Sequence, residues 1–325
     1  MSNSNKVNIA MIGCGQIAKA HLKSIENIPN AELVAVMDVV EEKARSMADQ
    51  YNAKLYTSIE SVLDDDSVDA VVLPLPHHLH CPVTIQAAKA GKHILVEKPM
   101  ALNLGEAQQM VEAVEAANVF LMVGQSTRFR PMVWRAKEII KSRKLGQMQQ
   151  CICQRLWFLE KLSTEWRYSS EECGGLYLPI FASHDVDMIL WLMDEKPVSV
   201  HSFLRSYTEV TDSESDGTIN IELSRGSIVN LSFSMTSHIS VQKTVLIGSE
   251  GTLLIDGSKL FLNNEEILLD MEKDQFTNQM REFVGSIIAG RQPRPSGSDV
   301  LPTIAVLDAA KESSLTNRLI RIGVP

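Results

Sequence analysis

The stretch that most constrains the fold is a glycine-rich turn near the N-terminus, between an apolar run and a helical pattern. Residues 13–18 read G-C-G-Q-I-A and directly follow the largely apolar run Val7–Ile12. Such a run is typical of a strand buried on both faces of a parallel sheet. Gly13 permits a tight turn, Gly15 lets backbone approach a phosphate, and the helix N-terminus behind them favours negative charge. The pattern predicts a dinucleotide-binding turn, although a glycine turn without a ligand stays open.

Strand and helix patterns alternate from this turn as far as residue 123. We expect further strands over 32–38, 55–57, 70–75, 93–97 and 119–123. We expect helices over 17–28, 41–51, 82–90 and 106–118, the last opened by a capping box of Asn103 and Glu106. This rhythm predicts an α/β fold, a doubly wound parallel sheet with right-handed crossovers.

The pattern changes near Gly124, which divides the 325 residues into two predicted domains, 1–124 and 125–325. Helical patterns in the second domain cover 132–144, 184–193 and 300–313, and whether the last helix packs back on the first domain stays open. Strand patterns at 218–222, 227–233, 244–248 and 252–255 are joined by glycine turns. They predict an α+β domain with a large, mostly antiparallel open sheet.

Charge and cysteine content narrow the class of protein. The net charge of −9 argues against nucleic acid and anionic membranes as partners, because both bind proteins through clusters of Lys and Arg. Five cysteines without a C-x-x-C pair do not suggest a disulfide framework. The polar start does not read as a secretory signal, so we expect a cytoplasmic protein without a membrane span.

Asp38 stands at the end of the second expected strand, where an acidic residue can accept hydrogen bonds from the adenosine ribose. Val39 follows, and no Lys or Arg stands beside it to bind a 2′-phosphate. The pattern therefore favours NAD over NADP.

Lys98 lies in the tripeptide Glu97-Lys98-Pro99 at the end of another expected strand. Ligands of open α/β sheets bind beyond the carboxyl ends of strands, and a lysine there can hold and pass a hydroxyl proton. Pro99 restricts the backbone of Lys98 to an extended conformation. From these residues alone, a solvated lysine in a turn is the favoured interpretation, and a catalytic lysine is the alternative.

With these motifs in place, the sequence resembles the Gfo/Idh/MocA family of nicotinamide-dependent oxidoreductases. The resemblance is dense over residues 7–146 and rests on the order and spacing of several motifs. These are the glycine loop, P-x-x-x-H at 76–80, A-G-K-H-I-L-V-E-K-P at 90–99, V-G-Q-S-T-R-F-R-P at 123–131 and K-x-x-I…L-G from 137 to 146. The resemblance implies a Rossmann domain followed by an α/β domain, a catalytic Lys98 with a cis bond to Pro99, and a homodimer or homotetramer formed through the open sheet face.

The resemblance also implies where the cofactor would be bound. The expected contacts are Gly13, Gly15, Gln16, Ile17, Asp38, Leu75, Pro76, His80, Glu97, Lys98 and Gln125. The family's T-P-N motif is altered here, with Leu75 at the Thr position and His77 at the Asn position. The segment His77-His78-x-His80 lacks the accompanying carboxylates or cysteines of a zinc site, so we expect cofactor-side lining and no metal.

In the second domain the resemblance implies His184 as the partner of Lys98 in proton handling, since imidazole titrates near neutral pH. A capping or core histidine is the alternative from the residues alone. Expected substrate contacts are Arg155, Trp166, Arg167, Tyr168 and Asp187. The family Asp one turn before the histidine is replaced by Ile180, which can neither orient nor share a proton.

The leading hypothesis is an NAD-dependent dehydrogenase that oxidises a hydroxyl of a sugar, polyol or related small molecule, or catalyses the reverse reduction. Two alternatives stay open. One is a redox-neutral enzyme that retains its NAD, similar to a glycosidase in outcome. The other is a nucleotide-sensing regulator with weakened catalysis, which the Ile180 replacement motivates.

Overall fold

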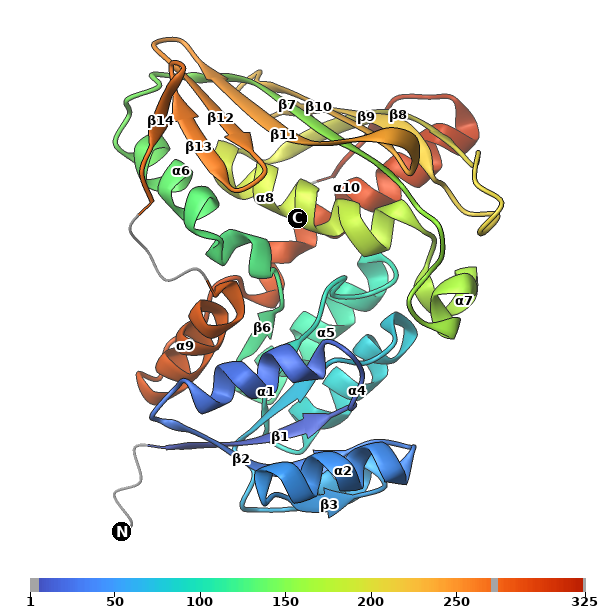
Figure 1. The fold of residues 1–325 in the computed structure, drawn as a ribbon, viewed down its shortest axis with the longest axis vertical. Helices are drawn as coiled ribbons and strands as arrows, with labels where there is room; N and C mark the ends of the chain where they lie inside the picture. The colour runs from blue at the N-terminus through green and yellow to red at the C-terminus, as the bar shows by residue number, and fades with distance from the viewer. Residues whose placement is uncertain (1–5, 270–273, 324–325) are drawn as a thin grey trace. The chain divides into compact units, whose positions relative to one another are not determined.

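The computed structural model describes residues 6–269 and 274–323, and the chain divides into two compact units (Figure 1). The first unit contains the chain up to Ser126 together with Asp274–Leu301, and the second contains Thr127–Lys273 and the chain from Pro302 onward. From the sequence we predict a single domain over the whole of 125–325. Contacts in the structure group the segment 274–301 with the N-terminal unit instead.

A six-stranded parallel sheet with the order β3-β2-β1-β4-β5-β6 forms the first unit. Its strands are β1 (Val7–Ile12), β2 (Ala31–Met37), β3 (Lys54–Tyr56), β4 (Ala70–Leu73), β5 (His93–Val96) and β6 (Leu121–Val123). The strand order runs outward in both directions from β1 and β4, as in a doubly wound sheet. β4 and β6 are buried at every position, which explains their continuous apolar sequences. The predicted parallel sheet is confirmed.

Helices accompany this sheet; those at 59–63 and 275–288 were not predicted from the sequence, and the others lie at or near the predicted places. They are α1 (Ala18–Glu26), α2 (Glu41–Tyr51), α3 (Ile59–Leu63), α4 (His77–Lys89), α5 (Leu104–Ala116) and α9 (Gln275–Ile288). The Asn103 side chain accepts a hydrogen bond from the Glu106 N–H at 2.9 Å, as the capping pattern predicted. The predicted start of α4 at Pro82 is wrong, because the helix already begins at His77 and contains Pro82. A proline removes one backbone hydrogen bond, a cost that this buried helix tolerates.

A nine-stranded sheet with the order β14-β13-β12-β11-β7-β10-β9-β8-β15 dominates the second unit. Its strands are β7 (Met148–Phe158), β8 (Pro197–Arg205), β9 (Asp216–Leu223), β10 (Ile228–Ser234), β11 (Thr236–Gly248), β12 (Thr252–Asp256), β13 (Lys259–Leu262), β14 (Glu265–Ile267) and β15 (Ile320–Arg321). Of its pairs, β7 with β10 is parallel and the other pairs between described strands are antiparallel. The predicted mostly antiparallel sheet is confirmed.

One face of this sheet shares a core with the helices of the unit. The longer helices are α6 (Pro131–Lys141), α8 (Ser183–Met193) and α10 (Gly297–Thr316), the last of which crosses from one unit into the other. Short helical segments are α7 (Ser170–Cys173), a π-helical turn at Leu178–Ala182 and 3-10 turns at Ser126–Phe129 and Glu165–Tyr168. The buried core includes Tyr177, Ile189, Leu231 and Leu246 from helix and sheet alike.

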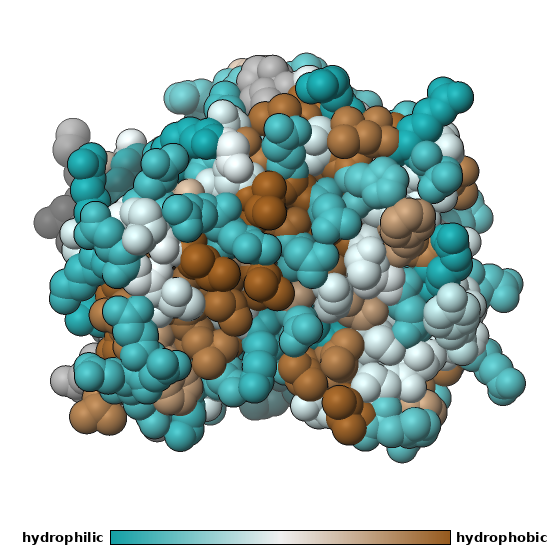
Figure 2. Space-filling view, turned by 90° about the horizontal axis from the view of Figure 1, so that it is seen from above, coloured by the Kyte–Doolittle hydropathy of each residue, from teal (hydrophilic) through white to brown (hydrophobic). Residues whose placement is uncertain are grey.

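The other face of the nine-stranded sheet carries a row of residues that are register partners across its strands. Phe261, Leu254, Val245 and Ile152 follow one another from β13 to β7 and are partly exposed. The row continues into the polar Asn230 on β10. Figure 2 looks onto this side of the sheet and shows apolar residues gathered among polar ones. A row of four apolar side chains therefore lies on this face of the sheet.

By length and composition alone, one helical run among the described residues, Ser170–Met193, could cross a membrane. From the sequence we predict no membrane span. In its most apolar window 83% of the residues are buried inside the fold, which is what the core helix of a globular protein shows. This helical run is therefore weak evidence for a membrane span.

A buried ion pair ties the beginning of the second unit to α8. Arg128 donates from Nε and Nη2 to the two carboxylate oxygens of Asp187, both at 2.7 Å. The Arg128 and Asp187 side chains are only 9% and 1% exposed. Two parallel charge-assisted hydrogen bonds, both buried, fix the position of the first turns of α8 relative to Arg128.

Asp187→Ala should lower the free energy of unfolding by about 3–5 kcal/mol, because Arg128 would stay buried without its counter-charge. Urea unfolding followed by circular dichroism measures this. The matched control is Glu138→Ala, which removes the exposed Arg135–Glu138 pair and should cost about 0–1 kcal/mol. Equal stability losses in the two variants would contradict a structural role for the buried pair.

Candidate active site

Most of the predicted cofactor residues follow the carboxyl ends of parallel strands. Gly13 and Gly15 follow β1, Asp38 follows β2, Leu75 and Pro76 follow β4, Glu97 and Lys98 follow β5, and Gln125 follows β6. Because these strands run in the same direction in one sheet, their carboxyl ends share one edge. The fold thus brings the predicted set together at the edge where open α/β sheets bind ligands.

The glycine loop has the geometry that the sequence predicted. Gly13 has a φ of +106°, and a Cβ there would lie 3.0 Å from the Pro74 carbonyl oxygen. Only glycine combines that backbone conformation with that close approach to the end of β4. A Cβ at Gly15 would meet nothing described within 4 Å, so the outer side of the loop is open to a ligand.

Asp38 organises this loop from the end of β2. Its Oδ2 accepts the Cys14 N–H at 2.7 Å and its Oδ1 accepts the Val40 N–H at 2.8 Å. Burial and the neighbouring Asp38 raise the pKa of the Cys14 thiol to about 11, so this cysteine stays protonated and packs. Lys43, in the first turns of α2, also acts electrostatically on Cys14, a basic neighbour that the sequence reading did not weigh.

These residues fit a dinucleotide. No side chain caps the start of α1 within the described chain, which leaves its first N–H groups suited to a pyrophosphate. Each Asp38 oxygen accepts a backbone N–H and has further lone pairs for ribose hydroxyls. At Gly15 the loop is open to the ligand, so backbone N–H groups and the positive end of the helix dipole can both contact a pyrophosphate.

Lys98 sits in a turn that is held by its neighbours on both sides. The Lys98–Pro99 peptide bond is cis, as the family resemblance implied. The Lys98 N–H donates to Glu97 Oε2 at 3.1 Å, and the Glu97 N–H donates to the Leu73 carbonyl at 3.3 Å. The backbone from which the lysine projects is therefore fixed by hydrogen bonds to the preceding residues.

The three histidines at the start of α4 do not form a metal centre. His80 is fully buried, and its ring nitrogens lie 2.7 Å from the Pro99 carbonyl oxygen and 3.0 Å from that of Leu75. Burial lowers the pKa of His80. Within residues 6–269 and 274–323 no group of three or more His, Cys, Asp or Glu is arranged to hold a metal ion.

In the second unit, His184 lies in the first turn of α8, directly after the π-helical turn. Ile180, which stands where the family has its Asp, is 4% exposed and belongs to the hydrophobic core. Asp187, one helical turn after His184, is engaged with Arg128. The structure thus gives Asp187 a structural partner, and its contact with substrate remains a prediction.

Arg155 is also committed within the protein. Its Nε donates to Asp185 at 2.8 Å, and its Nη groups donate to the carbonyls of Gln154 and Lys243 and to Thr244. Tyr177 donates its hydroxyl to the other oxygen of Asp185 at 2.9 Å. Burial first and Asp185 second raise the pKa of Tyr177, so the phenol remains a donor. This network anchors α8 to β7.

The remaining predicted substrate residues lie together on the 3-10 turn Glu165–Tyr168. The Arg167 guanidinium stacks over the Trp166 ring, with 5.2 Å from its carbon to the ring centroid. The Tyr168 hydroxyl accepts the Leu162 N–H at 3.0 Å. Their substrate roles also remain predictions.

Two features of the site were not predicted from the sequence. One is the buried contact between His21 and Glu97, and the other is the network of Arg155, Asp185 and Tyr177. The only sequence signal for His21 is its place on the inward face of the helix after the glycine loop. Asp185 carries no local signal, because its partners come from distant strands and turns.

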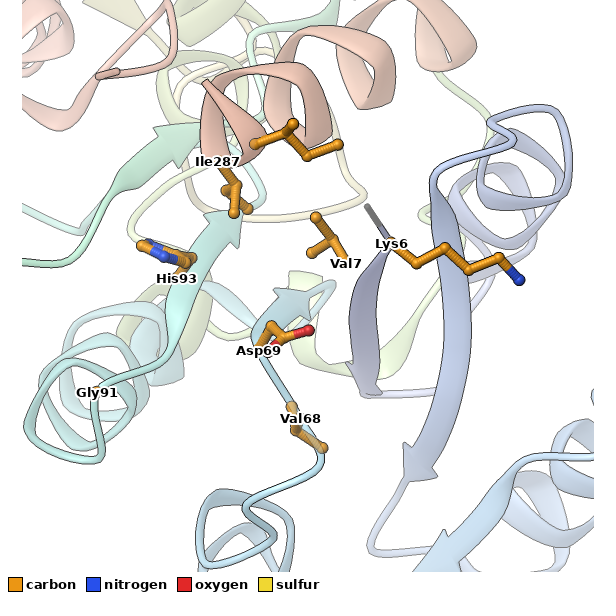
Figure 3. Close-up of a pocket in the computed structure, with 8 residues that line it drawn as sticks. Lys6, Val7, Val68, Asp69, Gly91, His93 and Ile287 are labelled. Carbon is orange, nitrogen blue, oxygen red and sulfur yellow. The ribbon is translucent and has the colours of Figure 1, made fainter. Parts of the chain in front are cut away.

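A separate hollow of about 380 Å³ opens at the opposite edge of the first sheet (Figure 3). It lies at the amino ends of β1, β4 and β5, where Val7, Asp69 and His93 meet Ile287 of α9. Its described lining contains none of the predicted site residues. The nucleotide edge is therefore identified by its chemistry and not by the size of this hollow.

Comparison with known proteins identifies related chains. The curated myo-inositol 2-dehydrogenase of Thermotoga maritima is 25% identical over 97% of this chain and 98% of its own length. The 2,7-anhydro-N-acetylneuraminate hydratase of Escherichia coli is 25% identical over 77% of this chain and 68% of its own. A levoglucosan dehydrogenase solved with NADH superposes with a TM-score of 0.91 at 20% identity, covering 98% of this chain and 100% of that one. At that identity the structural likeness shows the fold.

Two family models match consecutive parts of the sequence. The model described as an oxidoreductase family with an NAD-binding Rossmann fold matches residues 7–125. The Gfo/Idh/MocA C-terminal domain model matches residues 133–254. Together with the glycine loop, the Glu97-Lys98-Pro99 turn and the two-unit fold, these matches show that the chain belongs to the Gfo/Idh/MocA family of NAD-binding oxidoreductases.

Proposed function

We propose that this protein is an NAD-dependent dehydrogenase that oxidises a hydroxyl of a sugar, polyol or related compound, or catalyses the reverse reduction. The observation that carries the proposal is Lys98, which follows β5 at the nucleotide-binding edge of the sheet and whose N–H is bonded to Glu97. The relative named for myo-inositol oxidation supports a polyol-like substrate.

In the proposed reaction, bound NAD supplies the hydride acceptor. Lys98 and His184 share the remaining task, which is to hold the substrate hydroxyl and receive its proton. A general base must lie within hydrogen-bond reach of the proton that it takes. The proposal therefore requires that both side chains reach the same hydroxyl when substrate is bound.

A second candidate is a redox-neutral reaction in which NAD is retained and returns to its starting state. The relative named as a hydratase of an anhydro sugar favours it. The two candidates share the site and differ in whether net reduced nicotinamide accumulates. The purified protein would then carry bound NAD and convert its substrate without added cofactor.

Lys98→Ala should lower kcat by about 10²- to 10⁴-fold, the usual contribution of a positioned acid or base, while NADH affinity changes little. The assay is reduced nicotinamide absorbance across polyols, aldoses and sugar acids, with product analysis to detect redox-neutral turnover. The control is Lys89→Ala, an exposed lysine at the end of α4. Full turnover by the Lys98 variant would exclude this lysine from the chemistry.

Asp38→Asn should weaken the preference for NADH over NADPH by about tenfold, equivalent to about 1.4 kcal/mol, because the repulsion of a 2′-phosphate is reduced. Nicotinamide fluorescence measures both dissociation constants. Asp49→Asn, an exposed position on α2, controls for the change in net charge. An unchanged ratio in the Asp38 variant would mean that other groups, such as Lys43, set the preference.

We also propose a homodimer or homotetramer that covers the apolar row on the nine-stranded sheet. Phe261, Leu254, Val245 and Ile152 form a partly exposed row on four neighbouring strands. Large contiguous apolar patches on soluble proteins mark interaction surfaces. Because the face is an open sheet, a second copy can pack its own sheet against it.

Leu254→Arg should convert the assembly to monomers, because it places a charge in the middle of the buried row. Light scattering behind size-exclusion chromatography measures the molecular mass. Glu42→Arg, at an exposed site on α2, is the control and should leave the mass unchanged. A monomeric wild-type protein would contradict the proposed assembly but would not contradict the proposed reaction.

A further inference from the structure

His21 is a fully buried titratable side chain that the proposed reaction does not use. It lies on the inward face of α1, the helix that begins at the glycine loop. A buried polar ring normally has a specific partner, because burying it unpaired is costly. The partner of His21 leads directly to the turn that carries Lys98.

The His21 Nε2 atom lies 2.7 Å from Oε1 of Glu97, a side chain that is itself buried. The other carboxylate oxygen of Glu97, Oε2, accepts the backbone N–H of Lys98 at 3.1 Å. The two oxygens therefore link a helix side chain to the lysine backbone. The chain of contacts runs from α1 through one carboxylate to Lys98.

The surroundings leave the Glu97 carboxylate little room to move. A Cβ at Gly124 would lie 3.0 Å from Oε1 and 3.1 Å from Cδ of Glu97. On the other side of the imidazole, Phe276 of α9 packs edge-on against His21, with 5.5 Å between ring centroids and 79° between the planes. Glycine at position 124 and this aromatic contact define one position for the pair.

The hydrogen bonds also indicate which nitrogen of His21 carries a proton. Nε2 faces the carboxylate and donates to it. Nδ1 is buried and has no hydrogen-bond partner in the described structure. A proton on Nε2 satisfies the carboxylate, whereas a proton on Nδ1 would be a buried N–H without a partner.

The opposite side of the Lys98 turn is held by a second buried ring. His80 Nδ1 lies 2.7 Å from the Pro99 carbonyl oxygen, one residue after Lys98. His21 acts through the residue before Lys98, and His80 contacts the residue after it. The lysine backbone is thus held at both flanks by side chains from α1 and α4.

We propose that His21 is a positioning residue for Lys98, acting through the Glu97 carboxylate. The inference rests on the proposed function, because it gives His21 a role in the reaction only if Lys98 acts there. It also means that α1 serves two tasks, since its N-terminus faces the nucleotide and His21, at the end of its first turn, positions the lysine. Misplacement of a reacting group by about 1 Å can cost about 10²-fold in rate.

Two substitutions separate the hydrogen bond from the packing. His21→Phe keeps a ring against Phe276 but removes the donor to Glu97. His21→Gln retains an N–H donor near the position of Nε2 and is the conservative rescue. His93→Phe is the matched control. His93 is a partly buried ring at the start of β5, the strand that Glu97 directly follows, and its Nδ1 accepts the Phe120 N–H.

The expected result is a fall of about 10- to 100-fold in kcat for His21→Phe, with KM for substrate and the NADH dissociation constant within about threefold of wild type. His21→Gln should recover most of this loss. His93→Phe should lower thermal stability while kcat remains near the wild-type value. Thermal unfolding of all three variants reports the loss of stability separately.

A second readout does not depend on turnover. Lysines are converted to isotope-labelled dimethyl-lysines, and the NMR signal of Lys98 is assigned by its absence in Lys98→Arg. His21→Phe should shift or broaden this signal, and His21→Gln should restore it. The signal should be unchanged in His93→Phe.

If His21→Phe loses stability as His93→Phe does but leaves kcat and the Lys98 signal unchanged, His21 only packs and the inference is overturned. If wild type shows no turnover with any substrate but the Lys98 signal responds to His21→Phe, the positioning stands and the proposed reaction fails. The two failures are therefore distinguishable.

Discussion

Parallel pairing of β1 with β2 on one side and β4 on the other is the constraint on which the nucleotide site depends. Parallel strands deliver all their carboxyl ends to one edge, so the turns after β1, β2, β4, β5 and β6 are neighbours whatever their sequence separation. The backbone of Gly13 can then lie close to Pro74, and Asp38 can bind the Cys14 N–H. A residue that contacts the nucleotide therefore needs only to occupy one of the first positions after its strand.

Buried charge plays a different part in the second unit. The pairs Arg128–Asp187 and Arg155–Asp185 are nearly dry, and each joins α8 to another element. Buried pairs of this kind contribute less to net stability than to a unique geometry, because desolvation offsets much of their attraction. Together they fix the first turns of α8, which carry His184. The helix is thereby oriented by charges that flank the proposed catalytic residue.

The same pairs explain where sequence reasoning about the site was least informative. Arg155 and Asp187 have the residue types of a sugar-binding site, and in this fold they have protein partners at hydrogen-bond distance. A sequence shows that an arginine is present but not which carboxylate it meets, because the partners come from distant elements. By contrast, the glycine loop, the Asn103 cap and most helices and strands of the first unit could be predicted, because their signals are local. The start of α4 was misjudged, because proline is a weak helix boundary when tertiary packing holds the helix.

By itself the sequence determined the class of fold, the family and the edge at which a nucleotide binds, since strand periodicity, glycine turns and motif spacing act over a few residues. The tertiary structure alone decided that residues 274–301 join the first unit, that Ile180 is a core residue and that His21 contacts Glu97. These facts depend on which side chains are brought together across tens or hundreds of residues. That selection is made by the packing of whole elements, and no local pattern in the chain records it.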